Sequence, residues 1–190
     1  MRRRIIKPIK EGLENFRERK KSSIKILDVA TGSGRTLKQI RGACPKEKII
    51  GLDLSGSYLK EASRFISNLD GDLIELVKGN AEKLPFMDNT LQAITCVYLF
   101  HELPRTIREN VLKEFIRVLE PGGILVLADS IQINDSPDFT QIMENFHKSF
   151  HEPFYSDCIK DDINSKIEEI GFNNVKSKSF FMTKVWSAIK

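Results

Sequence analysis

Cysteine, long apolar stretches and low-complexity sequence are scarce in this chain of 190 residues. The three cysteines, Cys44, Cys96 and Cys158, are odd in number, far apart and without a CxxC pair. The sequence therefore predicts neither a disulfide framework nor a zinc knuckle. No apolar run approaches the roughly 18 residues of a membrane-spanning helix. The chain starts with a basic flank, but Lys7, Pro8, Lys10 and Glu11 break up any apolar core behind it, which argues against a secretory signal. These absences predict a cytoplasmic protein.

Positive charge is concentrated at the start of the sequence. The formal net charge is +4, but residues 1–25 hold ten Lys or Arg against three Glu, which gives this segment +7 and the remainder −3. A basic segment can bind nucleic acid or an anionic membrane surface. It can also be the solvated face of a helix, and the sequence favours this second interpretation.

Short apolar runs rich in β-branched residues alternate with amphipathic stretches. The first run, residues 24–30, ends in a glycine turn and is followed by a helical pattern. Further strands are predicted at residues 48–54, 72–78, 91–98 and 124–128, and two more at about 173–180 and 182–189. This alternation predicts a doubly wound α/β fold, a mainly parallel sheet with helices on both faces. The short link between the last two runs predicts an antiparallel hairpin.

Helical periodicity near the start predicts an amphipathic helix with Pro8 in its first turn. Its apolar positions are Ile5, Ile9, Leu13 and Phe16. We expect residues 1–22 to form this N-terminal helix and residues 23–190 to form the main domain.

Two further patterns concern later helices. Thr106 and Glu109 have the spacing of a capping box at the start of a helix. Near the end of the chain, isoleucines at helical spacing predict one last helix that Gly171 closes. They are Ile159, Ile163, Ile167 and Ile170.

The glycine turn lies where an open α/β sheet binds ligands, at the carboxyl end of a strand. Asp53 ends the second predicted strand about 20–25 residues later, where an acid typically binds ribose hydroxyls. This pair fits a dinucleotide or an adenosyl group. The dinucleotide is disfavoured because Leu37 stands at the third glycine of GxGxxG, because Asp28 precedes the loop, and because the chain ends in a hairpin.

The motifs resemble those of class I S-adenosylmethionine-dependent methyltransferases. Residues 28–34, with the sequence DVATGSG, resemble the family's first motif, although Ala30 replaces a glycine. Residues 51–55 (GLDLS), 80–86 (NAEKLPF) and 117–123 (RVLEPGG) are similar to later motifs in the same order. The resemblance implies a seven-stranded sheet with an antiparallel last strand, and S-adenosylmethionine as the cofactor. It is greatest toward small-molecule methyltransferases of ubiquinone and menaquinone biosynthesis.

The resemblance also implies roles for individual positions. The glycine loop would lie against the methionine part of the cofactor, Asp53 would bind the ribose hydroxyls, and Leu54 would pack on the adenine. The candidate cofactor-binding residues are Asp28, Ala30, Thr31, Gly32, Gly34, Asp53, Leu54, Asn80, Ala81, Glu82 and Tyr98.

The acceptor of the methyl group requires a base only if it must lose a proton. His101, directly after the fourth predicted strand, is the catalytic candidate, and a packing role is the alternative. A cluster of aromatic and imidazole side chains farther along predicts either a pocket for a hydrophobic or aromatic-ring acceptor, or core packing. With His101, the candidate substrate-binding residues are His147, Phe150, His151 and Tyr155. No metal site is predicted, because neither His-Glu pair has helical ligand spacing.

The sequence leaves other functions open. A nucleic-acid or protein methyltransferase is one alternative. The Asn/Asp-Pro-Pro-aromatic motif for exocyclic amines is absent, and the basic segment is the only support for a nucleic-acid substrate. A non-catalytic protein that binds the adenosyl cofactor is a further alternative, as is a nicotinamide-dependent oxidoreductase. We expect a small-molecule acceptor as the partner, and we expect neither nucleic-acid binding nor a membrane span. A second copy of the chain, in a homodimer, could complete the site.

Overall fold

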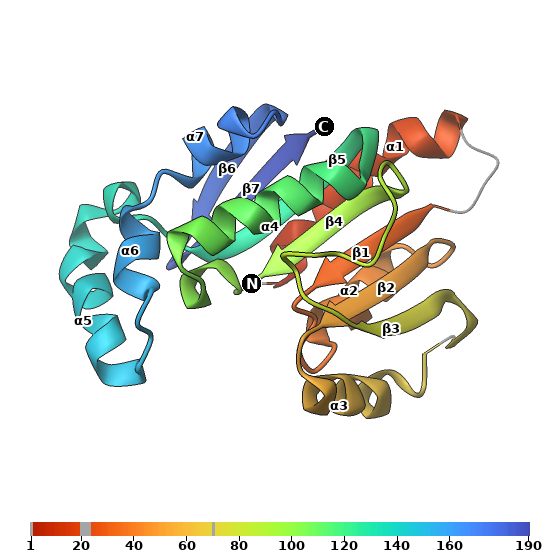
Figure 1. Ribbon diagram of the computed structural model, residues 1–190, viewed down its shortest axis with the longest axis horizontal. Helices are drawn as coiled ribbons and strands as arrows, with labels where there is room; N and C mark the ends of the chain where they lie inside the picture. The colour runs from red at the N-terminus through yellow and green to blue at the C-terminus, as the bar shows by residue number, and fades with distance from the viewer. Residues whose placement is uncertain (1, 20–23, 70) are drawn as a thin grey trace.

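The computed structural model describes residues 2–19, 24–69 and 71–190, apart from the side chains of residues 2, 15, 19 and 147–150. Its centre is a seven-stranded sheet in the order β3-β2-β1-β4-β5-β7-β6, in which β7 runs antiparallel to both of its neighbours (Figure 1). The strands are β1 (Lys25–Val29), β2 (Lys48–Asp53), β3 (Ile74–Lys78), β4 (Leu91–Val97), β5 (Leu119–Ser130), β6 (Asn173–Phe180) and β7 (Thr183–Ile189).

The α-helices connect the strands and cover both faces of the sheet. They are α1 (Ile6–Arg19), α2 (Arg35–Ala43), α3 (Gly56–Ile66), α4 (Arg105–Val118), α5 (Thr140–Phe150), α6 (Tyr155–Lys160) and α7 (Ile163–Glu169). In Figure 1, α4 lies in front of the sheet, and α1 and α2 lie behind it. The predicted doubly wound fold and its terminal antiparallel hairpin are confirmed.

Successive strand residues face opposite helix layers. Leu27 and Ile50 belong to the apolar core on the α4 side, whereas Ile26 and Ile49 belong to the core on the side of α1 and α2. Because both faces of the central strands are buried, β1, β2 and β4 are mainly apolar, which explains why they could be found from sequence. The fifth strand begins earlier than predicted, at Leu119, because Leu119 pairs with Leu91 across an irregularity in the register.

The predicted N-terminal helix is present as α1, preceded by a 3-10 helix at Arg2–Ile5. Its predicted apolar positions are buried against the sheet, with Ile9 and Leu13 fully inaccessible. Gly12 faces β5 so closely that a Cβ atom there would lie 2.5–2.7 Å from three side-chain atoms of Ile124. The predicted boundary between residues 22 and 23 falls at residues outside those that the structure describes.

Two helix predictions are wrong. The single last helix is broken into α6 and α7, because the side chain of Asp162 accepts a hydrogen bond from the Ser165 N–H and so begins a new helix. The capping box at Thr106 is also absent: α4 begins at Arg105 after Pro104, without a side-chain cap. Glu109 instead forms an ion pair with Lys166 of α7.

The only tryptophan of the chain, Trp186, lies in β7 with 1% of its surface exposed. Its indole Nε1–H donates a hydrogen bond of 2.8 Å to the Asn164 side chain of α7. This contact fixes α7 on the sheet. In the part of the chain that the structure describes, no helix has the length and apolarity to cross a membrane.

The close approach of α1 to β5 predicts opposite effects for two glycine-to-alanine substitutions. Gly12→Ala should destabilise the protein by about 1–3 kcal/mol, because the new methyl group overlaps Ile124. Gly42→Ala in α2 should stabilise it by about 0.5–1 kcal/mol, because nothing lies within 4 Å of the added Cβ and alanine favours the helix. Urea unfolding of both variants measures the difference, and equal stability of the two would contradict the described packing of α1.

Candidate active site

Buried carboxylates mark the carboxyl edge of the sheet. Asp28 in β1, Asp53 at the end of β2 and Asp129 near the end of β5 have 1%, 8% and 2% of their surface exposed. A buried carboxylate is stable only if hydrogen bonds replace its hydration. Each of these groups accepts such bonds from loops at this edge, so the carboxylates fix the loops at the end of the sheet where α/β folds bind ligands.

Asp53 connects the loops that follow β1 and β2. Its Oδ2 accepts a hydrogen bond of 2.8 Å from the Gly32 N–H, and its Oδ1 accepts one of 2.8 Å from the Ser55 N–H. Each carboxylate oxygen has a second lone pair, so further donors can still bind.

Asp28 supports the same loop from beneath. It accepts hydrogen bonds from the hydroxyls of Thr31, at 2.6 Å, and of Thr95 in β4, at 2.7 Å. These bonds link the start of the glycine loop to the neighbouring strand, and they give Asp28 a position behind the loop.

The glycine loop needs left-handed backbone at alternate residues. Ala30, Gly32 and Gly34 have φ angles of +53°, +55° and +79°. A Cβ added to Gly32 would meet nothing within 4 Å, whereas one added to Gly34 would lie 3.2 Å from the Cβ of Ala62. Ala30 therefore lowers the stability of the loop relative to a glycine at this position, because its Cβ makes the left-handed backbone conformation unfavourable.

A cavity of about 750 Å³, the glycine-loop cavity, opens above this loop. Most of the predicted cofactor-binding residues line it, namely Ala30, Thr31, Gly32, Asp53, Leu54, Asn80, Ala81, Glu82 and Tyr98. Asp28 and Gly34 are not among its lining residues; Asp28 lies behind the loop, and Gly34 packs against α3.

The sequence did not identify several other lining residues. Tyr58 projects from α3 with 53% of its surface exposed, and Ile107 and Val111 reach the cavity from α4. Helical periodicity assigns Ile107 and Val111 to an apolar face, but it cannot tell a cavity wall from the core.

Acids outnumber bases among the charged residues of the glycine-loop cavity. Asp53, Glu82 and Glu102 line it together with Arg35. Burial raises the pKa of Glu102, opposed by His101 and reinforced by Glu152, Asp129 and Asp53. The lining therefore favours a ligand with positive charge and disfavours the pyrophosphate of a dinucleotide.

The irregular segment before β4 is held by α4. The Arg117 guanidinium donates hydrogen bonds to the carbonyl oxygens of Leu84, at 3.1 Å, and Phe86, at 2.9 Å. Asn80 begins this segment, and its Oδ1 accepts a hydrogen bond of 3.0 Å from the Glu82 N–H. The wall formed by Asn80, Ala81 and Glu82 is thereby fixed without regular secondary structure.

A second cavity of about 740 Å³, the aromatic cavity, lies between the ends of β4, β5 and the β6–β7 hairpin. Its lining residues are Arg4, Tyr98, His101, Asp129, Ser130, Phe146, Tyr155, Phe180, Phe181, Met182 and Thr183. Tyr98 lines both cavities, so the two adjoin at the loop that follows β4. Tyr98 has a φ of +60°, and its hydroxyl lies 2.8 Å from Thr183 Oγ1.

His101 and Asp129 form a pair in the aromatic cavity. His101 Nδ1 lies 2.8 Å from Asp129 Oδ1, and the same carboxylate accepts hydrogen bonds from the N–H groups of Phe100 and Ser130. Burial lowers the pKa of His101, but the hydrogen bond and charge of Asp129 raise it more, so it lies above the ordinary value. When Nδ1–H donates to Asp129, the neutral ring keeps its lone pair on Nε2.

The structure separates the other residues of the predicted acceptor site. Tyr155 lines the aromatic cavity, and its hydroxyl lies 2.8 Å from Ser130 Oγ. His151 is exposed at the end of α5 and is not among the lining residues. The side chains of His147 and Phe150 lie outside the described residues. Among the described side chains, no three His, Cys, Asp or Glu are grouped so that they could hold a metal ion.

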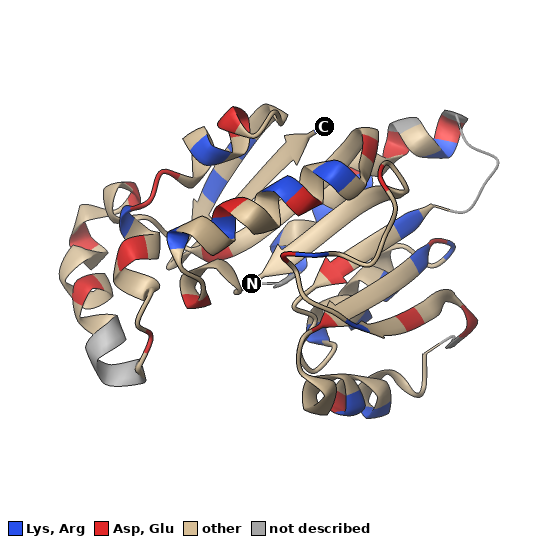
Figure 2. Cartoon of the chain, viewed as in Figure 1, with Lys and Arg blue, Asp and Glu red and all other residues tan. Residues whose placement is uncertain are grey.

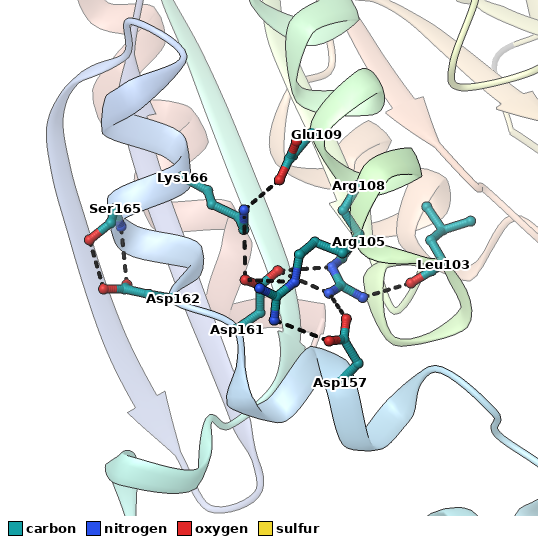
Figure 3. Close-up of polar contacts among 9 residues, drawn as sticks. All are labelled: Leu103, Arg105, Arg108, Glu109, Asp157, Asp161, Asp162, Ser165 and Lys166. Carbon is teal, nitrogen blue, oxygen red and sulfur yellow. Dashed lines mark hydrogen bonds and ion pairs between the residues drawn. The ribbon is translucent and has the colours of Figure 1, made fainter.

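A network of ion pairs joins α4 to α6 and α7 (Figure 3). Arg108 of α4 is fully buried and donates hydrogen bonds to the Leu103 carbonyl and to Asp157 and Asp161. Asp157 lies on α6, the helix that carries Tyr155. Arg105 and Lys166 lie beside the same acids, and Lys and Arg alternate with Asp and Glu along α4 (Figure 2). No local sequence pattern predicts this network, because Arg108 and its two acids are about fifty residues apart.

Comparison with known proteins identifies the family. A model of the methyltransferase domain matches residues 26–123, more than half of the chain. The chain is also 34% identical over 113 residues to the demethylmenaquinone methyltransferase of Bacillus cereus, an alignment that covers 59% of the chain and 47% of the relative. The chain thus spans about half the length of the curated relatives it matches.

Solved structures share the fold. The structure of an O-methyltransferase family protein from Burkholderia thailandensis is similar with a TM-score of 0.75 and 17% identity, covering 88% of this chain and 51% of that protein. Human N-acetylserotonin methyltransferase is similar with a TM-score of 0.71 and 16% identity, covering 100% of this chain and 51% of that one.

The left-handed backbone at Ala30 predicts that Ala30→Gly stabilises the protein by about 1 kcal/mol, because glycine adopts this conformation without the steric cost that alanine has. Urea unfolding measures the change, and Ala43→Gly, at the end of α2, is the control that should destabilise. A loss of stability in Ala30→Gly would contradict the described loop.

The pair of His101 and Asp129 predicts the titration of the imidazole. Protein NMR should show a pKa of His101 above the ordinary value of a histidine. Asp129→Asn should lower this pKa, because the burial that disfavours the charged ring is then no longer offset by the charge of Asp129. Glu102→Gln should lower it less, since Glu102 contributes through its charge alone.

The chain has three histidines, so His101→Gln assigns the resonance. An unchanged His101 pKa in folded Asp129→Asn would exclude the pair.

Proposed function

This chain belongs to the class I S-adenosylmethionine-dependent methyltransferases, and from that premise we propose that it methylates a hydroxyl group of a small, ring-bearing acceptor. The observation that carries the proposal is the position of the pair of His101 and Asp129 in the aromatic cavity, next to the glycine-loop cavity. The glycine-loop cavity would hold the cofactor, and the aromatic cavity would hold the acceptor.

The lining and the charge of the glycine-loop cavity support S-adenosylmethionine as its ligand. The open space beside Gly32 leaves room for a ligand against the backbone, and the Asp53 carboxylate can accept further hydrogen bonds from ribose hydroxyls. The acidic lining suits the positive sulfonium and ammonium groups. Leu54, with 67% of its surface exposed at the cavity, offers an apolar face to the adenine.

When bound, S-adenosylmethionine would supply the methyl group: the acceptor oxygen forms a bond to the methyl carbon while the bond from that carbon to sulfur breaks, and both electrons of the broken bond remain on sulfur. The acceptor hydroxyl must lose its proton, and His101 Nε2 accepts it. Asp129 holds the imidazole with Nδ1 protonated and stabilises the positive ring that forms. Because only the neutral ring is a base, the raised pKa of His101 predicts that turnover increases as the pH rises through that value.

The aromatic cavity supports a ring-bearing acceptor. Phe146 and Tyr155 lie with ring centroids 4.7 Å apart, and Met182 lines the same space. Such a lining binds planar apolar groups and excludes water from the reacting atoms. Two of the similar proteins are named for small molecules, demethylmenaquinone and N-acetylserotonin, which agrees with an acceptor of this size. Asp28 and Gly34 act here as positioning residues, behind and beside the loop.

Two substitutions separate cofactor binding from proton removal. Asp53→Asn should weaken the binding of S-adenosylhomocysteine by about 1.5–3 kcal/mol, the range for hydrogen bonds to a charged group. His101→Gln should leave this affinity unchanged but lower the rate of methyl transfer roughly 10²–10⁴-fold. Calorimetry measures the affinity, and release of S-adenosylhomocysteine with catechol or 3,4-dihydroxybenzoate measures the rate.

Glu61→Gln is the matched control, since this exposed carboxylate of α3 is not among the lining residues. Undiminished affinity in folded Asp53→Asn would remove Asp53 from the cofactor site. Full turnover in His101→Gln would show that the acceptor needs no base at this position.

A further inference from the structure

The mouth of the aromatic cavity carries a positive charge that methyl transfer itself does not require. Arg4 lies in the 3-10 helix before α1, is exposed, and lines the cavity together with Phe180 of β6. His101 lines the same cavity, but its side chain is only 16% exposed. Arg4 therefore marks the outer part of the cavity and His101 its inner part.

Contact with an aromatic ring holds Arg4 in place. The Cζ atom of its guanidinium lies 4.6 Å from the centroid of the Phe180 ring. A guanidinium over a ring is held by cation–π attraction and still has N–H donors that can bind an anion. Lys178 adds a second positive charge, with Nζ 5.4 Å from the centroid of the same ring.

The described acids do not neutralise this arginine. Within residues 2–19, 24–69 and 71–190, no Asp or Glu forms an ion pair with Arg4. Asp129, the acid that lines the aromatic cavity, is already bonded to His101 and to the N–H groups of Phe100 and Ser130. By contrast, Arg17, farther along the basic segment, is paired with Glu47.

We propose that Arg4 is an anion-binding subsite of the acceptor site, and that the acceptor is an aromatic ring bearing a carboxylate as well as the hydroxyl that is methylated. The inference rests on the proposed function, because it assigns the aromatic cavity to the acceptor. The ring lies among Phe146, Tyr155 and Met182, its hydroxyl faces His101, and its carboxylate binds Arg4. A guanidinium binds a carboxylate through two parallel hydrogen bonds, which also fixes the direction in which the ring enters.

Two probes that differ in one group test the subsite. Catechol and 3,4-dihydroxybenzoate are titrated by calorimetry into the full chain at pH 7.5, with and without saturating S-adenosylhomocysteine. The wild-type protein should bind 3,4-dihydroxybenzoate about tenfold or more tightly than catechol, as expected for a charge-assisted hydrogen bond. Arg4→Met, which keeps an apolar side chain against Phe180, should remove this preference while leaving the affinity for catechol unchanged.

Matched variants separate charge at the cavity from charge in general. Arg3→Met removes an exposed positive charge one residue away, at a position that does not line the cavity, and should keep the preference. Arg4→Lys should keep only part of it, because an ammonium cannot form the paired contact. Equal binding of the two probes by the wild type, no binding of the carboxylated probe, or a preference that survives in Arg4→Met would each overturn the subsite.

The same titrations keep the two proposals apart. Failure of S-adenosylhomocysteine to bind the wild-type protein would overturn the proposed function, whatever the probes do. Normal binding of S-adenosylhomocysteine, together with equal affinity for the two probes, would overturn the anion subsite alone.

Discussion

Hydrogen bonding of buried carboxylates at the carboxyl edge of the sheet organises the whole ligand-binding side of the molecule. Parallel strands end at one edge, and the loops leaving them have backbone N–H groups without partners. Asp53 accepts hydrogen bonds from two such groups, in the loops after β1 and β2. Asp129 accepts two more, from Phe100 in the loop after β4 and from Ser130 at the end of β5. Moving an unpaired carboxylate into this environment would cost several kcal/mol. Each acid is therefore stable only when its loops are in place, and each loop is placed by its acid.

The same constraint brings the chemistry together. Asp129 is hydrogen-bonded both to the Phe100 N–H and to the His101 ring. The same carboxylate therefore positions the loop between the two cavities and the proposed base, His101. Arg108 also positions α6 through its hydrogen bond to Asp157, and α6 carries Tyr155, whose hydroxyl contacts Ser130. Burial of Arg108 without its acids would be unfavourable, so the helices that cover the aromatic cavity are coupled to the helix that borders the glycine-loop cavity.

How much the sequence predicts depends on how far apart the interacting residues are. The glycine loop and Asp53 could be found because strand, turn and acid follow one another within a single βαβ unit. Asp129 also ends an apolar run, so its position carried a signal that went unused, whereas its bond to His101 joins segments 28 residues apart. The role of Arg108 could not be assigned, since its acids Asp157 and Asp161 lie about fifty residues away. The role of Arg117 could not be assigned either, since the carbonyl groups that it binds, at Leu84 and Phe86, lie more than thirty residues away. The break between α6 and α7 was missed because helical spacing of isoleucines continues across it, while the Asp162 side chain decides the local backbone.

The aromatic chromophores of this chain are divided between its core and its cavities. Trp186, the single indole, is enclosed between β7 and α7, and it belongs to neither cavity. The three tyrosines, Tyr58, Tyr98 and Tyr155, all line one cavity or both. Indole emission therefore reports whether the C-terminal part of the sheet is folded, while phenol absorption and emission respond to what occupies the cavities. The native protein thus carries two separate optical signals, one for folding and one for ligand binding, without any introduced label.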